Sequence, residues 1–256
     1  MKKTVISHFY NEEYLLPWWL NHHKQIFDQG IMINYESTDN SVNIIKEICP
    51  DWKIIQSKNE YFGAEEIDKE VSEIEKEIEG WKICLNTTEF IIGNFSILEH
   101  SPTEHINLGG RATRVTTGYG IPVHVMIDND RDNLPVYEKS LIEQKYYGMH
   151  YKEGGFNLRF GRLIHNSNNI EYPIGRHFDY TTEELVILWY GWSPFNTMSK
   201  QRKLQIQHRM PQSDKNRGFG TSHLVSDDVL ENQYIKDFLP RSRDLTEDLK
   251  LLMGEK

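Results

Sequence analysis

Polar side chains follow three apolar runs in the first ninety residues of the chain. They are Asn11-Glu12-Glu13, the residues from Asn34 to Asp39, and Asn86-Thr87-Thr88-Glu89. In an open parallel sheet, ligands bind at the carboxyl ends of the strands, where loops lead into helices. Taken singly, such residues also fit helix caps, because their side chains accept hydrogen bonds from free backbone N–H groups. Three such groups on adjacent strands favour a binding site.

An acidic group lies further along the chain. Asp128-Asn129-Asp130 comes directly after the apolar residues 123–127, and Asp132 is close by. Carboxylates at this spacing suit a divalent ion, and a single one suits a general base that takes a proton from a hydroxyl group. We expect Asp130 and Asp128 to be the catalytic residues; the alternative is an Asp- and Asn-rich turn.

A basic segment lies between residues 196 and 220, in a chain whose net charge is -9. Its one acid, Asp214, is set against six basic residues: Lys200, Arg202, Lys203, Arg209, Lys215 and Arg217. Folded over a site, Arg202 and Lys203 would neutralise a diphosphate, although a solvated helix face would have the same composition. The aromatic residues at 189–194 fit either a platform for a sugar ring or a buried core.

Regular elements must position these residues, and hydrophobic periodicity predicts them. In the first half, helices are expected at 15–27, 42–48 and 64–79, and strands at 5–10, 31–33, 53–56 and 81–85. Pro17 is expected in the first turn of its helix, and Gly80 at the end of the third. Strands and helices that alternate in this order favour parallel strands with helical crossovers. The predicted fold class is α/β, with a mostly parallel central sheet flanked by helices.

The second half is less regular. We expect strands at 115–119, 122–127 and 185–192, and helices at 135–147 and 198–210. Residues 148–176 are rich in Gly, Asn and aromatic side chains, which is typical of loops around a substrate. The acidic tail after Leu224 is expected to be helical. The chain is interpreted as one domain with a nucleotide-binding half (1–93), a donor and acceptor region (94–224) and a C-terminal tail (225–256).

Composition excludes several classes. The negative net charge argues against nucleic acid or an anionic membrane as the main partner. Cys49 and Cys84 form no disulfide framework and no zinc spacing, which favours a reducing, cytoplasmic location. No stretch has the roughly 20 apolar residues of a membrane span. The Gly-rich phosphate motifs of dehydrogenases and P-loop enzymes are absent from the sequence.

The first half of the chain resembles the family-2-like glycosyltransferases. The resemblance is carried by Asn11-Glu12-Glu13, by Trp19 with His22-His23, by the residues from Ser37 to Ser41, and by Glu89-Phe90, and it covers residues 4–93. These enzymes have the GT-A fold, an α/β sheet that binds a nucleotide-diphosphate sugar. The resemblance therefore implies a UDP- or GDP-type sugar donor and a carbohydrate or other hydroxyl acceptor.

The resemblance also assigns residues. Asn11, Glu12, Asn34 and Asp39 would hold the base and ribose of the nucleotide, although the family usually has Asp where this chain has Asn34. A neutral amide can still hydrogen-bond a uracil or a ribose. We add Asn86, Thr88, Arg202 and Lys203 to this cofactor-binding set.

The metal site implied by the family is altered in this chain. Its usual pattern is Asp-x-Asp, which binds a divalent ion that bridges the diphosphate, and here Asn86-Thr87-Thr88-Glu89 takes its place. Hard ions such as Mn²⁺ and Mg²⁺ bind anionic oxygens, and Glu89 alone supplies one. In related enzymes a distant His completes the site, so Glu89 and His177 are the expected metal ligands, with His165 as a second choice. Otherwise cationic side chains neutralise the diphosphate, or activity is lost.

Three functions therefore remain open. The first is a glycosyltransferase that moves a sugar from a nucleotide diphosphate to a hydroxyl group. The second is an inactive protein of the same fold that binds a nucleotide or a glycan. The third is a nucleotidyltransferase, whose phosphate site would suit the same strand ends.

Overall fold

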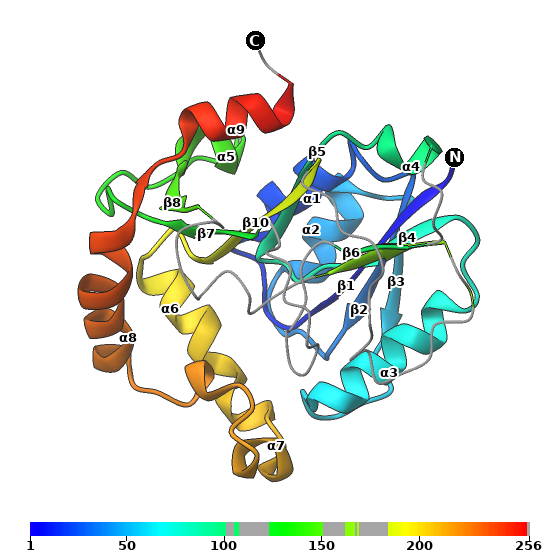
Figure 1. The fold of residues 1–256 in the computed structure, drawn as a ribbon. Coiled ribbons are helices and arrows are strands. Elements are labelled where there is room, and N and C mark those ends of the chain that lie inside the picture. The colour runs from blue at the N-terminus through cyan, green and yellow to red at the C-terminus, as the bar shows by residue number, and fades with distance from the viewer. Residues whose placement is uncertain (101–104, 108–122, 151–161, 167, 169–183, 255–256) are drawn as a thin grey trace.

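The computed structural model describes residues 1–100, 105–107, 123–150, 162–166, 168 and 184–254. Two β-sheets form the framework of this part of the chain, and helices pack around them (Figure 1). None of the helices described is long and apolar enough to cross a membrane.

The first sheet has six strands in the order β3-β2-β1-β4-β9-β6. The strands from β3 to β4 are parallel, whereas β9 pairs antiparallel with both β4 and β6. This confirms the predicted α/β class and its mostly parallel sheet. The strands are β1 (Lys3–Phe9), β2 (Gln29–Asn34), β3 (Lys53–Gln56), β4 (Trp81–Cys84), β6 (His105–Asn107) and β9 (Leu163–His165).

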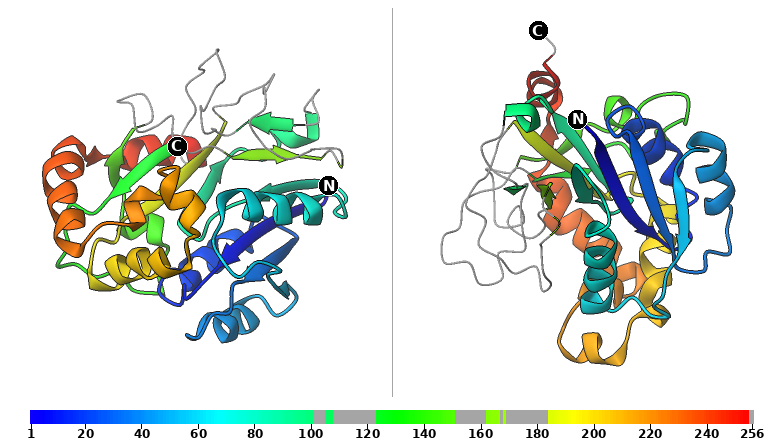
Figure 2. Two further views of the ribbon diagram at one scale, coloured as in Figure 1. Left: turned by 90° about the horizontal axis from the view of Figure 1, so that it is seen from below. Right: turned by 90° about the vertical axis from the view of Figure 1, so that its right-hand side faces the viewer.

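Helices cover both faces of the first sheet (Figure 2). Successive side chains of β1 point to opposite faces: Val5 joins the core cluster that contains Leu16 of α1, whereas Ile6 packs with Val71 of α3. Burial on both faces confirms the short buried strand predicted at 5–10, although Thr4 and Ser7 of β1 are buried polar residues. The helices are α1 (Leu16–His23), α2 (Ser41–Ile48) and α3 (Ala64–Glu75).

The second sheet has five strands in the order β11-β8-β7-β10-β5. Its central strand β10 runs parallel to β7 and antiparallel to β5. Because β5 follows β4 after a short turn at 85–88, that turn connects the two sheets. The strands are β5 (Glu89–Gly93), β7 (Val123–Ile127), β8 (Tyr147–Met149), β10 (Leu185–Trp192) and β11 (Arg243–Asp244).

The helices after β10 enclose one side of the second sheet. Leu230, Tyr234 and Phe238 form a buried cluster with Trp192 of β10. The helices of the second half are α4 (Ile97–His100), α5 (Leu141–Gln144), α6 (Thr197–Leu204), the 3₁₀ helix η1 (Gln205–Arg209), α7 (Gln212–Asn216), the 3₁₀ helix η2 (Thr221–His223), α8 (Asp227–Gln233), the π-helix η3 (Tyr234–Phe238), the 3₁₀ helix η4 (Leu239–Arg241) and α9 (Thr246–Met253).

The helix predicted at 135–147 is wrong. Only Leu141–Gln144 is helical, and Tyr147 already begins β8. The side chain of Gln144 accepts a hydrogen bond from the Val136 amide and donates to the carbonyl oxygens of Val136 and Lys139. These bonds satisfy backbone groups that a longer helix would have paired internally, so the segment folds as a loop closed by one side chain.

Five strands were not predicted, namely β5, β6, β8, β9 and β11, and two helix predictions are too long, the first of them because α1 ends at His23 rather than Phe27. β5 was interpreted as part of the polar end of the preceding strand, and β9 lies in the segment expected to be loops. The third helix ends at Glu75 rather than Glu79, and Gly80, with a φ of 84°, turns the chain into β4. The strand predicted at 115–119 lies outside the described residues.

Candidate functional site

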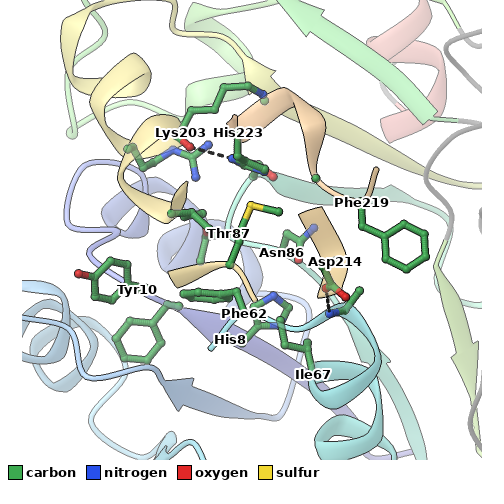
Figure 3. Close-up of a pocket in the computed structure, with 18 of the residues that line it drawn as sticks. His8, Tyr10, Phe62, Ile67, Asn86, Thr87, Lys203, Asp214, Phe219 and His223 are labelled. Carbon is green, nitrogen blue, oxygen red and sulfur yellow. Dashed lines mark hydrogen bonds between the residues drawn. The ribbon is translucent and has the colours of Figure 1, made fainter. Parts of the chain in front are cut away.

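A cavity of about 350 Å³ lies at the carboxyl ends of β1 and β4 (Figure 3). Its walls come from β1, from the turn after β4, from the residues before and within α3, and from the segment that runs from α6 to η2. Figure 3 shows Lys203 and His223 at one end, Phe62 and His8 at the other, and Thr87 and Asn86 between them. The predicted basic segment therefore does fold over the strand ends.

One end of the cavity is aromatic. The rings of Tyr35 and Phe62 stack with centroids 4.4 Å apart, and His8 and Tyr10 approach Phe62 at 6.4 and 6.0 Å. The Phe62 amide donates a 2.8 Å hydrogen bond to the Arg209 carbonyl oxygen, which ties this end to the basic segment. Burial, with the charge of Arg162, lowers the pKa of His8 to about 4, so its imidazole is neutral at pH 7.

A buried ion pair lies in the wall of the cavity. The guanidinium of Arg202 on α6 is 2.8 Å from Oε1 of Glu12, and the two side chains are 11% and 6% exposed. Burial raises the pKa of the Glu12 carboxyl, and the Arg202 charge opposes that rise. The Glu12 backbone N–H donates to Ser41 Oγ at 2.8 Å, so α2 helps to fix its position.

Three residues of the cavity wall carry a buried polar atom without a hydrogen-bond partner in the described part of the chain. Nδ1 of His8, Oε2 of Glu12 and Nε of Arg202 are buried and have no hydrogen-bond partner among the residues described, and all three residues line the cavity. Buried polar atoms in native proteins nearly always have a partner, because an unpaired one loses its hydration without compensation.

Lys203 is a buried cation beside the ion pair. Its side chain lies over the Trp192 ring, with Nζ 4.5 Å from the centroid, and within the described ranges no carboxylate forms an ion pair with it. Burial, together with the charge of Arg202, lowers the pKa of Lys203 to about 7. Nδ1 of His223 donates a 2.7 Å hydrogen bond to the Lys203 carbonyl oxygen, which holds η2 against α6.

The turn between β4 and β5 carries the predicted strand-end residues. Asn86 and Thr88 line the cavity together with Thr87. The indole N–H of Trp19 donates to the carbonyl oxygens of Asn86 and Glu89, at 3.1 and 2.9 Å. These hydrogen bonds hold the turn against α1, while Asn86, Thr87 and Thr88 line the cavity.

Glu89 does not line the cavity, and its carboxylate is already bound. Its Oε2 accepts a 2.7 Å hydrogen bond from Nε of Arg162 and another of 2.7 Å from the Asn86 amide. The Glu89 side chain is 2% exposed, and that of Arg162 is 22% exposed. A guanidinium therefore occupies the position where the resemblance implies a metal ion.

The donor set of this turn does not fit a divalent ion. Asn86, Thr87 and Thr88 are neutral, and the one carboxylate is paired with a guanidinium. Across the described ranges, no group of three or more His, Cys, Asp or Glu side chains is placed to hold a metal ion. The predicted ligand His177 lies outside the described residues. His165 lies on β9 with its Nε2 3.3 Å from a Glu75 carboxylate oxygen.

The other predicted nucleotide ligands hold loops together. Oδ1 of Asn11 accepts from the Thr38 amide at 2.7 Å, and Oδ1 of Asn34 accepts from the Ser37 amide at 2.9 Å. The Asp39 carboxylate accepts from the amides of Glu13 and Ser41, at 2.9 and 3.0 Å. Asn11, Asn34 and Asp39 brace the loops after β1 and β2 and are not among the residues that line the cavity.

The two predicted catalytic aspartates occupy different environments. Asp128 is buried, with Oδ1 2.7 Å from Nζ of Lys145 and Oδ2 accepting from the Phe195 amide at 3.1 Å. Nζ of Lys145 also donates to the carbonyl oxygens of Asp130 and Asn133. Asp130 is exposed and accepts a hydrogen bond from the Asn133 amide, as in a turn. Both carboxylates lie outside the cavity wall.

Several cavity residues were not predicted from the sequence. His8 and Tyr10 stand on either side of the apolar Phe9 at the carboxyl end of the first strand, and this alternation would have identified them. Phe62 and His223 carry no such signal, because loops bring them to the cavity. Arg162 lies within a segment rich in Gly, Asn and aromatic residues, and nothing local marks it.

Comparison with known proteins gives distant likenesses. No protein-family model and no curated protein matches the sequence. TarS residues 1–349 from S. aureus, also solved with UDP and with UDP-GlcNAc, is 21% identical over 48% of this chain and 38% of that chain, with a TM-score of 0.34. This chain thus spans about 38% of the length of that structure.

Two further structures are similar at the same level. Glucosyl-3-phosphoglycerate synthase from Mycobacterium tuberculosis, solved with Mn²⁺, UDP and glucosyl-3-phosphoglycerate, is 12% identical over 35% of this chain and 34% of that chain, with a TM-score of 0.28. HddC from Yersinia pseudotuberculosis is 10% identical over 75% of this chain and 95% of that chain, with a TM-score of 0.38. The mostly parallel sheet flanked by helices is the α/β arrangement that the resemblance implies.

Proposed function

We propose that this chain is a glycosyltransferase that binds a nucleotide-diphosphate sugar in the cavity and moves the sugar to an acceptor hydroxyl. The observation that carries the proposal is the cavity at the strand ends, whose wall combines the aromatic rings of Tyr10 and Phe62 with the basic side chains of Arg202 and Lys203. Ligands of α/β proteins bind at this edge of the sheet.

A nucleotide fits the chemistry of the walls. The ring of Tyr10 or Phe62 offers a face on which a base can stack, and neutral His8 offers an acceptor or donor beside it. Arg202 and Lys203 place positive charge in the opposite part of the cavity. Their neighbourhood suits a diphosphate, and the resemblance favours the UDP or GDP type.

The reaction would be a displacement at the anomeric carbon. The acceptor oxygen forms the new bond, the bond to the diphosphate oxygen breaks, and a carboxylate takes the hydroxyl proton. Exposed Asp130 stays our prediction for that base, whereas the ion pair with Lys145 leaves Asp128 no oxygen free of a partner. Arg202 and Lys203 would stabilise the charge that develops on the leaving diphosphate.

A second candidate is a protein of this fold that binds a nucleotide or a glycan without turnover. It is favoured by the neutral turn Asn86-Thr87-Thr88, where the related enzymes have aspartates. Binding and turnover are therefore measured separately.

The first experiment measures the melting temperature of the protein with UDP, GDP and their sugars. A ligand at about 100 times its dissociation constant adds about 2.7 kcal/mol, which for this chain length raises the midpoint by roughly 5–10 °C. Tyr10→Leu is expected to weaken binding by about 1–3 kcal/mol, because it removes one face of the stack. Tyr61→Leu is the matched control, since Tyr61 is 47% exposed and does not line the cavity.

The outcomes separate the candidates. A shift with one nucleotide family that Tyr10→Leu reduces and Tyr61→Leu preserves supports the cavity as the donor site. Sugar transfer or donor hydrolysis by the same sample then supports the enzyme, and binding without either supports the second candidate. No shift with any nucleotide or nucleotide sugar contradicts the proposed function and leaves only the glycan-binding form of the second candidate.

A further inference from the structure

We propose that Arg162 replaces the divalent ion at the turn after β4, so that the donor diphosphate binds to this protein without a metal. This inference rests on the proposed function, because it concerns how the same cavity holds its donor. It also makes a claim about the apoprotein that is testable without any nucleotide: Glu89 is not a metal ligand.

The contacts of Glu89 are the first support. Its carboxylate is almost fully buried. One oxygen, Oε2, accepts hydrogen bonds of 2.7 Å from the Arg162 guanidinium and from the backbone N–H of Asn86. An ion at this carboxylate would have to displace a charge-assisted hydrogen bond in a site shielded from water, where such bonds are strong. A metal ion would thus compete with the Arg162 guanidinium for the Glu89 carboxylate.

The other carboxylates of the cavity wall are the second support. Glu12 is paired with Arg202, and Oδ2 of Asp214 accepts a 2.8 Å hydrogen bond from the Ala64 amide at the start of α3. Each acidic residue in the wall as described is therefore engaged by a guanidinium or a backbone N–H. Each of these two carboxylates already has a donor, which a hard cation would have to displace or share.

The charge of the turn is the third support. Asn86 and Thr88, which line the cavity, are neutral. Without a partner, the carboxylate of Glu89 next to them would repel a diphosphate in the cavity. The Arg162 guanidinium cancels that charge, and its influence reaches His8 on the cavity wall, whose pKa it helps to lower. The turn then offers amide and hydroxyl groups without net charge, and Arg202 on α6 adds a cation to the same wall.

Mn²⁺ binding followed by electron paramagnetic resonance tests the claim on the apoprotein. The wild type is expected to bind no Mn²⁺ through Glu89, whereas Arg162→Gln frees the carboxylate and creates a Mn²⁺ site. The double variant Glu89→Gln/Arg162→Gln keeps a neutral, hydrogen-bonding pair and is expected to lose that site again. Wild-type Mn²⁺ binding that Glu89→Gln abolishes would overturn the proposal.

Nucleotide affinity with EDTA and with Mn²⁺ tests the consequence for the donor. Affinity of the wild type for the nucleotide that raises the melting temperature is expected to change by less than about tenfold between the two conditions. Arg162→Gln is expected to bind weakly in EDTA and to recover with Mn²⁺. Arg243→Gln is the matched control, because its ion pair with Asp248 lies on β11 and α9, away from the cavity.

The two proposals fail in different ways. A wild type that binds nucleotide only with Mn²⁺ overturns the role of Arg162 and leaves the proposed function standing. A wild type that binds no nucleotide in either condition overturns the proposed function, and the Mn²⁺ titration still decides whether Glu89 is a metal ligand.

Discussion

At the scale of residues, the Glu12–Arg202 pair shows how the cavity wall combines stability with binding. The two residues are 190 positions apart, so the pair fastens α6 to the loop after β1. It is nearly buried, and each partner keeps one polar atom without a hydrogen bond. The pair therefore holds α6 against the loop after β1 and brings the Arg202 side chain into the cavity wall.

Arg202→Met should destabilise the protein strongly. The change leaves the Glu12 carboxylate buried without its counter-charge, and breaking a buried pair from one side costs about 3–5 kcal/mol. The double variant Glu12→Gln/Arg202→Met removes both charges and should lose less. Urea denaturation gives the free energies of unfolding of both variants.

Arg243→Met provides the comparison, because the Arg243–Asp248 pair is 43% and 34% exposed and such pairs contribute about 0–1 kcal/mol. If Glu12→Gln/Arg202→Met loses as much stability as Glu12→Gln and Arg202→Met lose together, Glu12 and Arg202 do not interact.

The sequence predicts residues well where one local pattern decides their position. Asn86, Thr88 and Glu12 follow apolar strands, and they reach the cavity because parallel strands end on one edge. Arg202 and Lys203 were identified by charge alone, and α6 places them in the same wall. Local patterns do not tell whether a polar side chain turns to the ligand or to its own loop, and Asn11, Asn34 and Asp39 turn to their loops.

At the scale of elements, Asp128 and Lys145 fix the irregular segment between β7 and β8. The Lys145 ammonium binds the carboxylate at the end of β7 and the carbonyl oxygens of Asp130 and Asn133. Asp128 also receives the Phe195 amide, and the Tyr234 hydroxyl donates to its carbonyl oxygen. One ion pair therefore joins β7, α5, the start of α6 and the C-terminal helices.

Lys145→Met should lower the free energy of unfolding by about 3–5 kcal/mol, because it leaves a buried carboxylate and two carbonyl oxygens without their donor. Lys139→Met, in the same segment but exposed, should stay within about 0.5 kcal/mol of the wild type. Chemical denaturation with tryptophan fluorescence measures both. A stable Lys145→Met protein would show that the pair does not support the fold.

Periodicity predicted several elements of both sheets and of the helices around them, and it failed where side-chain hydrogen bonds replace backbone pairing. β1, α2, β3 and β10 were predicted within one or two residues, because burial on one or two faces imposes a strict apolar spacing. The segment at 135–147 was predicted to be a helix, yet the Gln144 side chain binds backbone groups of Val136 and Lys139. Hydrogen bonds between a side chain and backbone groups several residues away cannot be recognised from the apolar spacing of a short stretch of sequence.

At the scale of the whole molecule, buried neutral histidines tie stability to pH. Nδ1 of His23 donates to the Trp19 carbonyl oxygen at 2.8 Å, and its Nε2 accepts from the Ile91 amide at 3.4 Å. This arrangement requires the neutral ring, and burial lowers the pKa of His23 well below its ordinary value. Burial also lowers the pKa of His124, to about 3.

The free energy of unfolding should fall as the pH drops below about 6.5. The unfolded chain binds protons at these histidines there and the folded chain does not, so each can contribute up to about 1.4 kcal/mol per pH unit. Glu12 and Asp128, whose pKa values burial raises, act in the opposite direction as the pH falls. His23→Leu removes one titrating group, and its stability should depend less steeply on pH between 7 and 5.

Urea denaturation at several pH values measures the two slopes. Equal slopes for the wild type and His23→Leu would mean that the folded and the unfolded chain bind the same number of protons at His23 in this pH range. His100→Leu is the control, because His100 is exposed and shows no comparable burial.

The bond from Trp19 to the turn after β4 has a consequence for the kinetics of recognition. Because one indole N–H holds two carbonyl oxygens of the turn, its backbone already has its shape before a ligand arrives. A ligand then spends no free energy on ordering that backbone, and the encounter needs no preceding rearrangement there. The speed of association would be set by entry into the cavity, and differences in affinity between ligands would appear as differences in how long each one stays.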